Sequence, residues 1–325
     1  MKKIRLGLIG LGFIGRVHLI NSLNLSSVSV VAVSDTSNKA LEFARKRGIK
    51  QAYSDYHMLL NEARIDAVVI ALPTHLHLDC AKEAAESGKH IFLEKPLAKN
   101  VEEGKEITSV AEKNGVKLMV GYPYRFSPLF QDLKEKVDNG ELGKIQIAHA
   151  TRIGPGPFSH RAEEGGPSPV PEWWFKKELT GGGVLTDFGS HLINLTRWYF
   201  GEVDKIKAYL GYKFNFDFED SAVCIVEFKS GTTGIINVGW SSQESSLEVK
   251  LFGSVAHAYA GYSTQSRFKT AIQLLLRKSP KYHLEELSHF VDCVRDDVQP
   301  SPSGEDALRD LETIAQAYKN QIHME

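Results

Sequence analysis

Apolar positions follow two different periods along the chain, and the period changes near residue 121. In the first part, short apolar runs rich in β-branched residues predict buried strands, and the segments between them carry apolar residues at helical spacing. Strands that alternate with helices predict a parallel, doubly wound sheet of the α/β class. The predicted strands cover 4–9, 28–33, 65–72, 90–93 and 117–121, and the predicted helices cover 16–25, 39–47, 77–87 and 101–114.

After residue 121, apolar residues recur at every second position, which is typical of strands that bury one face. Helical spacing returns at 184–200 and at 303–322, and Lys229-Ser230-Gly231 predicts a hairpin turn. The second part is therefore predicted to be an α/β domain with a large, mostly antiparallel sheet. Its predicted strands cover 144–153, 205–210, 221–228, 233–238 and 247–252.

The change of period divides the chain into a domain of residues 1–121 and a domain of residues 122–325. The last predicted helix, 303–322, begins with Ser303 as its capping residue, and Asp306 suits the positive first turn. We expect this helix to pack back onto the first domain. A broad sheet with one uncovered face must bury that face or make it polar. We therefore expect a homodimer or homotetramer formed through the sheet of the second domain.

The loop after the first predicted strand has the spacing G-x-G-x-x-G, with Gly10, Gly12 and Gly15 in the three places. The first glycine permits a tight turn, the second lets the backbone approach a pyrophosphate, and the third brings helix and strand together. The pyrophosphate is expected at the N-terminus of the following helix, where free N–H groups favour negative charge. This stretch predicts a dinucleotide site, lined also by Phe13 and Ile14.

Asp35 follows the second predicted strand, about 20 residues beyond Gly15, where the fingerprint expects an acidic residue. A carboxylate there accepts hydrogen bonds from both ribose hydroxyls and repels a 2′-phosphate. The sequence therefore favours NAD over NADP. The alternative is a glycine turn followed by a solvated aspartate, and the match of strand, loop, helix and acid argues against it.

Composition narrows the function without identifying it. Of the 325 residues, 42% are hydrophobic and 24% are charged, which is ordinary for a globular protein. The 39 basic and 40 acidic side chains give a net charge of −1, which argues against a nucleic-acid binder. The 3 cysteines show no C-x-x-C spacing, and no apolar run reaches membrane-spanning length. We expect a cytoplasmic protein without a signal peptide or a membrane, nucleic-acid or metal partner.

Two further places carry side chains suited to proton transfer. Lys95 stands at the carboxyl end of a predicted strand, where its ammonium would polarise a substrate oxygen and stabilise a developing alkoxide. Asp187 and His191 lie four residues apart on a predicted helix, and hence on one face, after Gly181-Gly182-Gly183. A histidine that titrates near neutrality is a natural acid or base for an alcohol proton.

Each of these residues also has an ordinary structural interpretation. Lys95 can be a solvated lysine paired with Glu94, and Asp187 and His191 can be a helix N-terminal aspartate and a hydrogen-bonded core histidine. A metal-dependent hydrolase is a further alternative, because several histidines and Asp187 could converge. No recognised spacing of metal ligands supports it.

In their order and spacing, the glycine loop 10–15, Glu94-Lys95-Pro96 and Gly181-Gly182-Gly183 with Asp187 and His191 resemble the Gfo/Idh/MocA oxidoreductase family. The resemblance covers nearly the whole chain. It implies a Rossmann domain, a second α/β domain with a large, mostly antiparallel sheet, and a triad of Lys95, Asp187 and His191 that faces the nicotinamide. It also implies cofactor contacts from Glu94, from Lys95 and from the loop after the third strand, namely Leu72, Pro73, Thr74 and His77.

The chain departs from the family pattern at Pro123, where asparagine is usual. A side-chain hydrogen bond at the domain junction is then missing, and Arg125 is the polar residue that is left there. In the second domain, Trp173 or Trp174 would stack on a sugar ring. Arginines near the proline-rich loop 154–171 would suit the carboxylate of a sugar acid or the phosphate of a nucleotide sugar, unless they only secure that loop. The expected substrate-binding residues are Lys95, Tyr124, Arg125, Arg152, Arg161, Trp173, Asp187 and His191.

These residues predict an NAD-dependent oxidoreductase that reversibly oxidises a secondary ring hydroxyl of a sugar, an inositol or a sugar derivative. His191 would take the hydroxyl proton, Asp187 would orient the imidazole, and Lys95 would stabilise the oxyanion, while the cofactor accepts the hydride. Two alternatives stay open. One is a non-catalytic sensor that binds NAD and a sugar, and the other is a relative that cleaves glycosides through transient oxidation.

Overall fold

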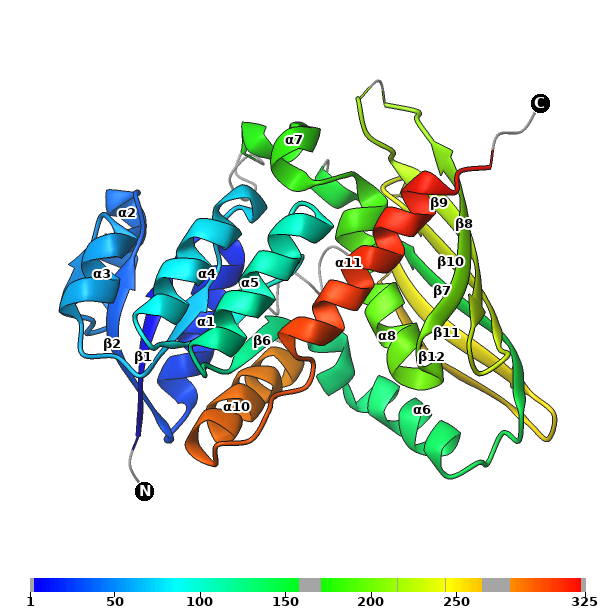
Figure 1. The fold of residues 1–325 in the computed structure, drawn as a ribbon, viewed down its shortest axis with the longest axis horizontal. Helices are drawn as coiled ribbons and strands as arrows, with labels where there is room; N and C mark the ends of the chain where they lie inside the picture. Colours follow the sequence, from blue (N-terminus) through cyan, green and yellow to red (C-terminus); the bar gives the residue numbers. More distant parts are fainter. Residues whose placement is uncertain (1–2, 158–170, 215, 243, 265–280, 323–325) are drawn as a thin grey trace. The chain divides into compact units, whose positions relative to one another are not determined.

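The computed structural model describes residues 3–157, 171–214, 216–242, 244–264 and 281–322. The chain forms two compact units (Figure 1). The first comprises Met1–Pro123 and Arg277–Leu308, and the second comprises Tyr124–Leu276 and Arg309–Glu325. Within the described ranges, no helix combines the length and the apolar character that a membrane crossing requires.

The first unit contains a six-stranded parallel sheet in the order β3-β2-β1-β4-β5-β6. The predicted doubly wound sheet is therefore confirmed. The strand order reverses between β1 and β4, and sheets of this type bind ligands beyond the carboxyl ends of the strands at that point. The strands are β1 (Ile4–Ile9), β2 (Val28–Ser34), β3 (Gln51–Tyr53), β4 (Ala67–Ile70), β5 (His90–Glu94) and β6 (Leu118–Gly121).

Helices cover this sheet, and β4 is buried along its whole length as a result. Helix α4 packs beside α5, and α1 packs beside α10 (Figure 1). The short β3 and α3 are not predicted by the sequence, because three and seven residues are too few to show a clear period. The helices are α1 (Phe13–Asn24), α2 (Asn38–Arg45), α3 (Tyr56–Glu62), η1 (Thr74–Leu76), α4 (His77–Glu86), α5 (Val101–Lys113) and α10 (Lys281–Arg295).

Helix α10 belongs to the first unit, although it lies late in the chain. It contacts α1, β1 and β5, and its buried face includes Leu287, Phe290 and Val291. The sequence places this segment among the residues of the second domain. An amphipathic stripe shows that a helix is covered but does not identify the sheet that covers it.

The second unit contains a six-stranded sheet in the order β12-β11-β7-β10-β9-β8. The pair β7 and β10 is parallel and the other pairs are antiparallel, so the predicted mostly antiparallel sheet is confirmed. The predicted turn 229–231 joins β9 to β10, and Gly231 has a φ of 85° there. The strands are β7 (Ile145–Ile153), β8 (Val203–Gly211), β9 (Ser221–Phe228), β10 (Thr233–Gly239), β11 (Ser245–Gly253) and β12 (His257–Thr264).

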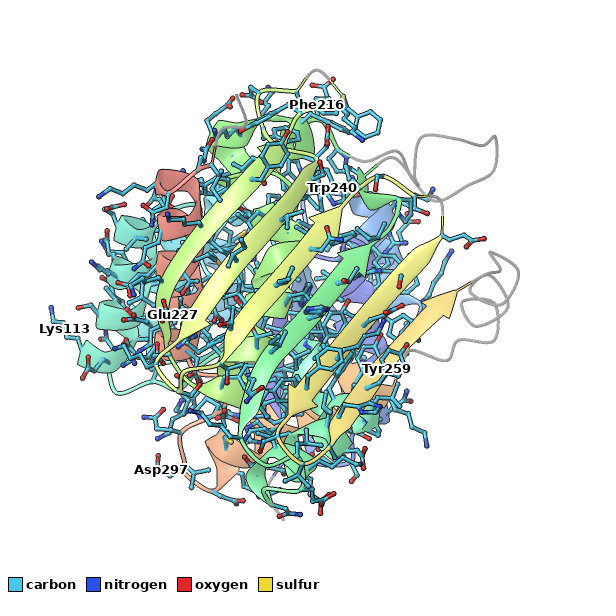
Figure 2. All side chains as sticks on the ribbon, turned by 90° about the vertical axis from the view of Figure 1, so that its right-hand side faces the viewer. Lys113, Phe216, Glu227, Trp240, Tyr259 and Asp297 are labelled. Atoms are coloured by element: carbon cyan, nitrogen blue, oxygen red, sulfur yellow. The ribbon has the colours of Figure 1, made fainter. Side chains whose placement is uncertain are left out.

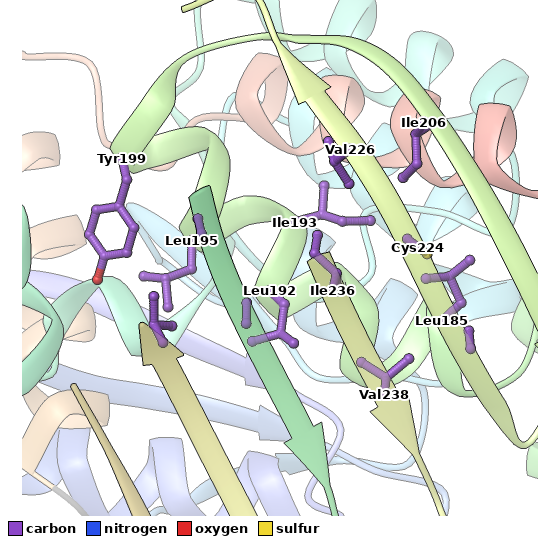
Figure 3. Close-up of a cluster of buried hydrophobic side chains, with 14 of the residues drawn as sticks. Leu185, Leu192, Ile193, Leu195, Tyr199, Ile206, Cys224, Val226, Ile236 and Val238 are labelled. Atoms are coloured by element: carbon purple, nitrogen blue, oxygen red, sulfur yellow. The ribbon is translucent and has the colours of Figure 1, made fainter. Parts of the chain in front are cut away.

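One face of this sheet is covered by helical segments, and the core of the unit lies between them. Apolar side chains of η5 and α8, such as Leu192 and Ile193, meet strand residues such as Cys224, Ile236 and Val238 (Figure 3). The other face carries large apolar side chains that are only partly covered, and Figure 2 looks onto it. The remaining helical segments are η2 (Pro123–Phe126), α6 (Pro128–Asp138), η4 (Glu172–Phe175), α7 (Lys177–Thr180), η5 (Leu185–Gly189), α8 (Ser190–Phe200) and α11 (Gly304–Lys319).

The N-terminus of α11 is capped as the sequence predicts. Ser303 Oγ accepts a hydrogen bond from the Asp306 amide at 3.1 Å, and the Ser303 amide donates to the Asp306 carboxylate at 2.9 Å. This reciprocal arrangement is a capping box. The helix ends at Lys319, three residues before the predicted end.

Candidate active site

The loop between β1 and α1 places its three glycines in different surroundings. Gly10 has a φ of 88°, and a Cβ there would lie 2.3 Å from the carbonyl oxygen of Ala71. A Cβ on Gly15 would lie 2.0 Å from the carbonyl oxygen of Gly10, whereas no described heavy atom lies within 4 Å of a Cβ on Gly12. The fold therefore requires the first and third glycines, and the second leaves the backbone open to a ligand.

Helix α1 begins directly after this loop, with Gly12 as its N-cap residue. Among the described residues, no side chain makes a capping hydrogen bond at this end, and the first turn carries no acidic residue. The first hydrogen bond within the helix is donated by the Arg16 amide to the Gly12 carbonyl. The earlier amides of the turn and the positive end of the helix dipole therefore suit an anion. Phe13 is 68% exposed at the same turn. These residues fit the pyrophosphate of a dinucleotide.

Asp35 follows β2 and holds the glycine loop. Its Oδ2 accepts a hydrogen bond from the Leu11 amide at 2.6 Å, and its Oδ1 accepts one from the Ser37 amide at 2.8 Å. A carboxylate has about four acceptor positions, so each oxygen can still accept a ribose hydroxyl. The same negative charge would repel a 2′-phosphate, which agrees with the predicted preference for NAD.

The loop after β4 contains Leu72, Pro73 and the buried Thr74, and His77 holds it in place. Nδ1 of His77 lies 3.0 Å from the Pro96 carbonyl oxygen, and its Nε2 lies 2.9 Å from the Leu72 carbonyl oxygen. Burial lowers the pKa of this imidazole. The sequence predicts direct contact between His77 and the cofactor. Both ring nitrogens face backbone carbonyls, so His77 connects the loops after β4 and β5, and its contact with the cofactor stays a prediction.

Glu94 and Lys95 lie at the end of β5. Glu94 is 8% exposed, its Oε1 lies 2.5 Å from His18 Nε2, and a Cβ on Gly121 would lie 3.3 Å from its carboxylate. Burial raises the pKa of Glu94, but the hydrogen bond and charge of His18 outweigh this effect, so the pKa is lowered overall. Lys95 is half-buried, and its peptide bond to Pro96 is cis.

The sequence does not predict the buried cluster around Glu94. It combines His18 of α1 with two residues of α10, His283 and Glu286, whose Nδ1 and Oε2 atoms lie 3.7 Å apart. Burial lowers the pKa of His283 to about 4 and raises that of Glu286 well above its usual value. Only the position of His18, on the buried side of a helix three residues after Gly15, offers a signal in the sequence. In the part of the chain that the structure describes, no group of three or more His, Cys, Asp or Glu side chains forms a metal site.

The sequence predicts that Asp187 and His191 lie on one continuous α-helix, and this prediction is wrong. Asp187 belongs to the π-helical turn η5, and α8 begins at Ser190. A π turn pairs residues i and i+5, so the spacing rule for an α-helix does not apply across it, and such turns are frequent at functional sites. Both side chains are half-buried, and the ring centroid of Tyr124 lies 4.7 Å from that of His191.

Arg125 is buried behind this helix. Its Nε donates to Asn194 Oδ1 at 2.7 Å, and Asn194 Nδ2 donates to Asp310 at 2.6 Å. Arg197 also bonds to Asp310, so the four side chains form one buried network. These contacts show that Arg125 supports α8, and its predicted contact with substrate stays a prediction.

Arg152, at the end of β7, contacts the π turn η5 from the sheet. Its guanidinium lies 4.5 Å from the ring centroid of Phe188, next to Asp187, and its Nη1 donates to the carbonyls of Ile153 and Ser246. Trp173 lies on η4 with its ring centroid 5.6 Å from that of Trp174. Arg161 and residues 158–170 of the proline-rich loop lie outside the described residues.

Comparison with known proteins follows the two units of the chain. Residues 4–122 match a model described as an oxidoreductase family with an NAD-binding Rossmann fold, and residues 130–258 match a GFO/IDH/MocA C-terminal domain. The chain is 30% identical to scyllo-inositol 2-dehydrogenase (NAD(+)) of Bacillus subtilis, over 95% of this chain and 92% of that protein. It is 29% identical to myo-inositol 2-dehydrogenase of Thermotoga maritima, over 93% and 92%. A crystal structure of a probable dehydrogenase from Thermotoga maritima has a TM-score of 0.84 at 28% identity, covering 98% of this chain and 97% of that one.

Proposed function

The chain belongs to the Gfo/Idh/MocA family of NAD-binding oxidoreductases, and we propose on this premise that it oxidises a secondary ring hydroxyl of an inositol or a related polyol. The reaction is reversible and uses NAD. The observation that carries the proposal is the similarity to two inositol 2-dehydrogenases over 93% and 95% of the chain. The open backbone at Gly12 and the carboxylate of Asp35 supply the matching cofactor site.

We assign the proton transfer to His191 and the orientation of its imidazole to Asp187. The half-buried position of His191 against the Tyr124 ring supports this assignment, because packing restricts the ring to few orientations. Lys95 stabilises the negative charge that develops on the substrate oxygen. NAD, when bound, accepts the hydride from the ring carbon.

An uncharged substrate is supported by the contacts of the two described arginines. Arg152 Nη1 donates to two backbone carbonyls and Arg125 Nε donates to Asn194, so structural contacts already engage part of each guanidinium that would bind a carboxylate or phosphate. A neutral polyol needs hydrogen bonds but no countercharge. Trp173 provides a ring for the apolar face of such a substrate.

The test is NADH formation by the purified protein with myo-inositol, scyllo-inositol, glucose and a nucleotide sugar. We expect turnover with an inositol and its loss in Lys95→Met and His191→Gln. Lys113→Met and His57→Gln make the same substitutions at exposed residues, so they serve as matched controls and should keep wild-type rates. Wild-type rates in the Lys95 and His191 variants would refute the catalytic assignment, and NAD binding without turnover of any polyol would favour a sensor.

We also propose that a second copy of the chain covers the open face of the second sheet. Large apolar side chains point out of this face from neighbouring strands and are 38–55% exposed (Figure 2). Several are direct cross-strand neighbours, such as Ile225 with Ile235 and Ile147 with Phe252. An Ile225→Lys/Ile235→Lys variant should shift the mass measured by light scattering toward the monomer, and an unchanged oligomer would contradict the proposal. The exposed residues are Ile147, Tyr209, Val223, Ile225, Ile235, Phe252 and Tyr259.

A cytoplasmic location completes the proposal. Its support is the state of the three cysteines, Cys80, Cys224 and Cys293, which are all buried and free. Free buried thiols are typical of proteins that work in a reducing compartment. Fractionation of the source cells with detection of the native chain tests this location, and recovery from a secreted fraction would contradict it.

A further inference from the structure

The start of the helical segment that carries Asp187 and His191 is held by one residue, Glu219. Three successive amides donate to it. The Gly183 amide donates to its Oε2 at 3.3 Å, the Leu185 amide donates to its Oε1 at 2.9 Å, and the Val184 amide donates to its carbonyl oxygen at 3.0 Å. The first amides of a helix have no intrahelical partner, so an external acceptor determines where the segment begins.

The Glu219 carboxylate is 1% exposed and is shared with the C-terminal helix. Tyr318 Oη of α11 donates to its Oε1 at 2.8 Å. Because the phenol has a single proton, the Thr186 hydroxyl, 3.0 Å from Tyr318 Oη, acts as the donor in that contact. Burial raises the pKa of Glu219 overall, and the bonds from the Leu185 amide and Tyr318 offset only part of this effect. All these partners are donors, so the contacts fit the ionised carboxylate.

Two of the three glycines before the helix are required because Glu219 and Tyr318 lie so close to the backbone there. A Cβ on Gly183 would lie 2.0 Å from the Glu219 carbonyl oxygen, and a Cβ on Gly182 would lie 2.2 Å from Tyr318 Oη and 2.3 Å from Thr186 Oγ1. The glycine motif is therefore a point of close contact with Glu219 and Tyr318. Any side chain at Gly183 would push Glu219 away from the helix.

The neighbours of Glu219 fix it from the side of the sheet. Phe218 stacks on Phe216 with a centroid distance of 5.0 Å and an interplanar angle of 7°, and it meets Trp240 edge to face. Asp220 accepts hydrogen bonds from the amides of Lys213 and Phe214, and its carbonyl accepts one from the Trp240 amide. Phe216 and Trp240 are labelled at this end of the sheet in Figure 2. These contacts restrict the position of Glu219 between the sheet and the helical segment.

We propose that Glu219 is a positioning residue for the acid–base pair, which it serves by accepting the amides of Gly183 and Leu185 and the hydroxyl of Tyr318. The proposal rests on the proposed roles of Asp187 and His191. Asp187 lies two residues after Leu185, within the same π turn, so a shift of the anchored end moves its carboxylate relative to the imidazole. Tyr318 extends the same support to the C-terminal helix.

Glutamine is the informative replacement, because it keeps the shape of the side chain but has one acceptor oxygen. The amides of Gly183 and Leu185 contact different carboxylate oxygens, so one of them must face the NH₂ group. A displacement of about 1 Å in a catalytic group can lower the rate by about 100-fold. We expect Glu219→Gln to lower kcat by roughly 10- to 100-fold, while the affinity for NAD, which is bound by the first unit, stays unchanged.

The experiment compares the wild type with Glu219→Gln, Tyr318→Phe and Asp220→Asn in NAD-dependent oxidation of myo-inositol and scyllo-inositol. Asp220→Asn is the matched control, because both loop amides contact the same oxygen of the neighbouring buried carboxylate, which the asparagine amide oxygen replaces, and no amide of the helix contacts it. Its kcat should stay within about twofold of the wild type. Tyr318→Phe removes one hydrogen bond but keeps both amide contacts, so we expect a smaller loss of about threefold.

A second readout does not depend on turnover. The Tyr124 ring, 4.7 Å from that of His191, makes the NMR resonances of the His191 ring sensitive to its orientation. These resonances should move in Glu219→Gln and keep their positions in Asp220→Asn. If the wild type oxidises no polyol, the proposed function fails, but the resonances still support or overturn the positioning role. A kcat loss no larger than that of Asp220→Asn, or unmoved resonances, would overturn it. If Glu219→Gln does not fold, a wild-type kcat and spectrum in Tyr318→Phe would overturn it.

Discussion

Gly12→Ala and Gly15→Ala add the same methyl group at two points of one loop and should have opposite effects on stability. No described heavy atom lies within 4 Å of a Cβ on Gly12, and its φ of −64° suits any residue. Alanine restricts the unfolded chain there, so we expect the free energy of unfolding to rise by about 0.4–1 kcal/mol. At Gly15 the methyl group would lie 2.0 Å from the Gly10 carbonyl oxygen. The backbone must shift to avoid this contact, so we expect the free energy of unfolding to fall by about 1–3 kcal/mol.

Gly12→Ala should weaken the binding of NAD, although it raises the free energy of unfolding. Its methyl group would fill the open space through which the backbone approaches the pyrophosphate. A hydrogen bond to a charged acceptor contributes about 1.5–3 kcal/mol. Losing one such bond corresponds to a roughly 10- to 150-fold rise in the Kd for NAD.

The measurements are urea unfolding followed by circular dichroism and NAD binding followed by titration calorimetry. Gly12→Ala should be at least as stable as the wild type and bind NAD weakly, and Gly15→Ala should be less stable. The reasoning would be refuted if Gly12→Ala bound NAD with wild-type affinity. It would also be refuted if Gly12→Ala lost as much stability as Gly15→Ala.

Two further predictions concern buried ionisable groups. Asp310→Ala removes the buried carboxylate that Arg197 and Asn194 contact and leaves Arg197 paired with the partly exposed Glu202, so the free energy of unfolding should fall by up to about 3–5 kcal/mol in urea unfolding, and a loss below about 1 kcal/mol would contradict this. Burial lowers the pKa of His283 to about 4, so between pH 6.5 and 4 this residue binds more protons in the unfolded chain, and its contribution to the free energy of unfolding should decrease by up to about 3 kcal/mol as the pH falls. His283→Gln should remove this contribution, and the same pH dependence as in the wild type would count against it.

The features that the sequence predicts well are those that depend on neighbouring residues. The glycine loop needs a strand, three glycines and a helix in direct succession, so its spacing is visible before any tertiary contact is known. The alternation in β9 likewise follows from the two faces of one strand, and the structure buries every second residue there. Ser303 with Asp306 is equally local, since both partners lie within one helical turn.

The features that the sequence does not predict depend on contacts between distant segments. His18 meets Glu94 across 76 positions, and Gly183 meets Glu219 across 36, and no spacing rule connects such pairs. Burial of these acids also runs against the usual exposure of glutamate, so residue type alone points the wrong way. The π turn around Asp187 has no sequence signature, because its residues would serve equally well in an α-helix.

The most direct test of the central claim follows the hydrogen that leaves the ring. The protein is incubated with NAD and an inositol deuterated at every ring carbon, and the NADH formed is analysed by mass spectrometry. Oxidation of a secondary ring hydroxyl by hydride transfer predicts one deuterium in each NADH, and none of this product with His191→Gln. NADH without deuterium, or labelled NADH at the wild-type rate from His191→Gln, would contradict the proposed reaction and its base.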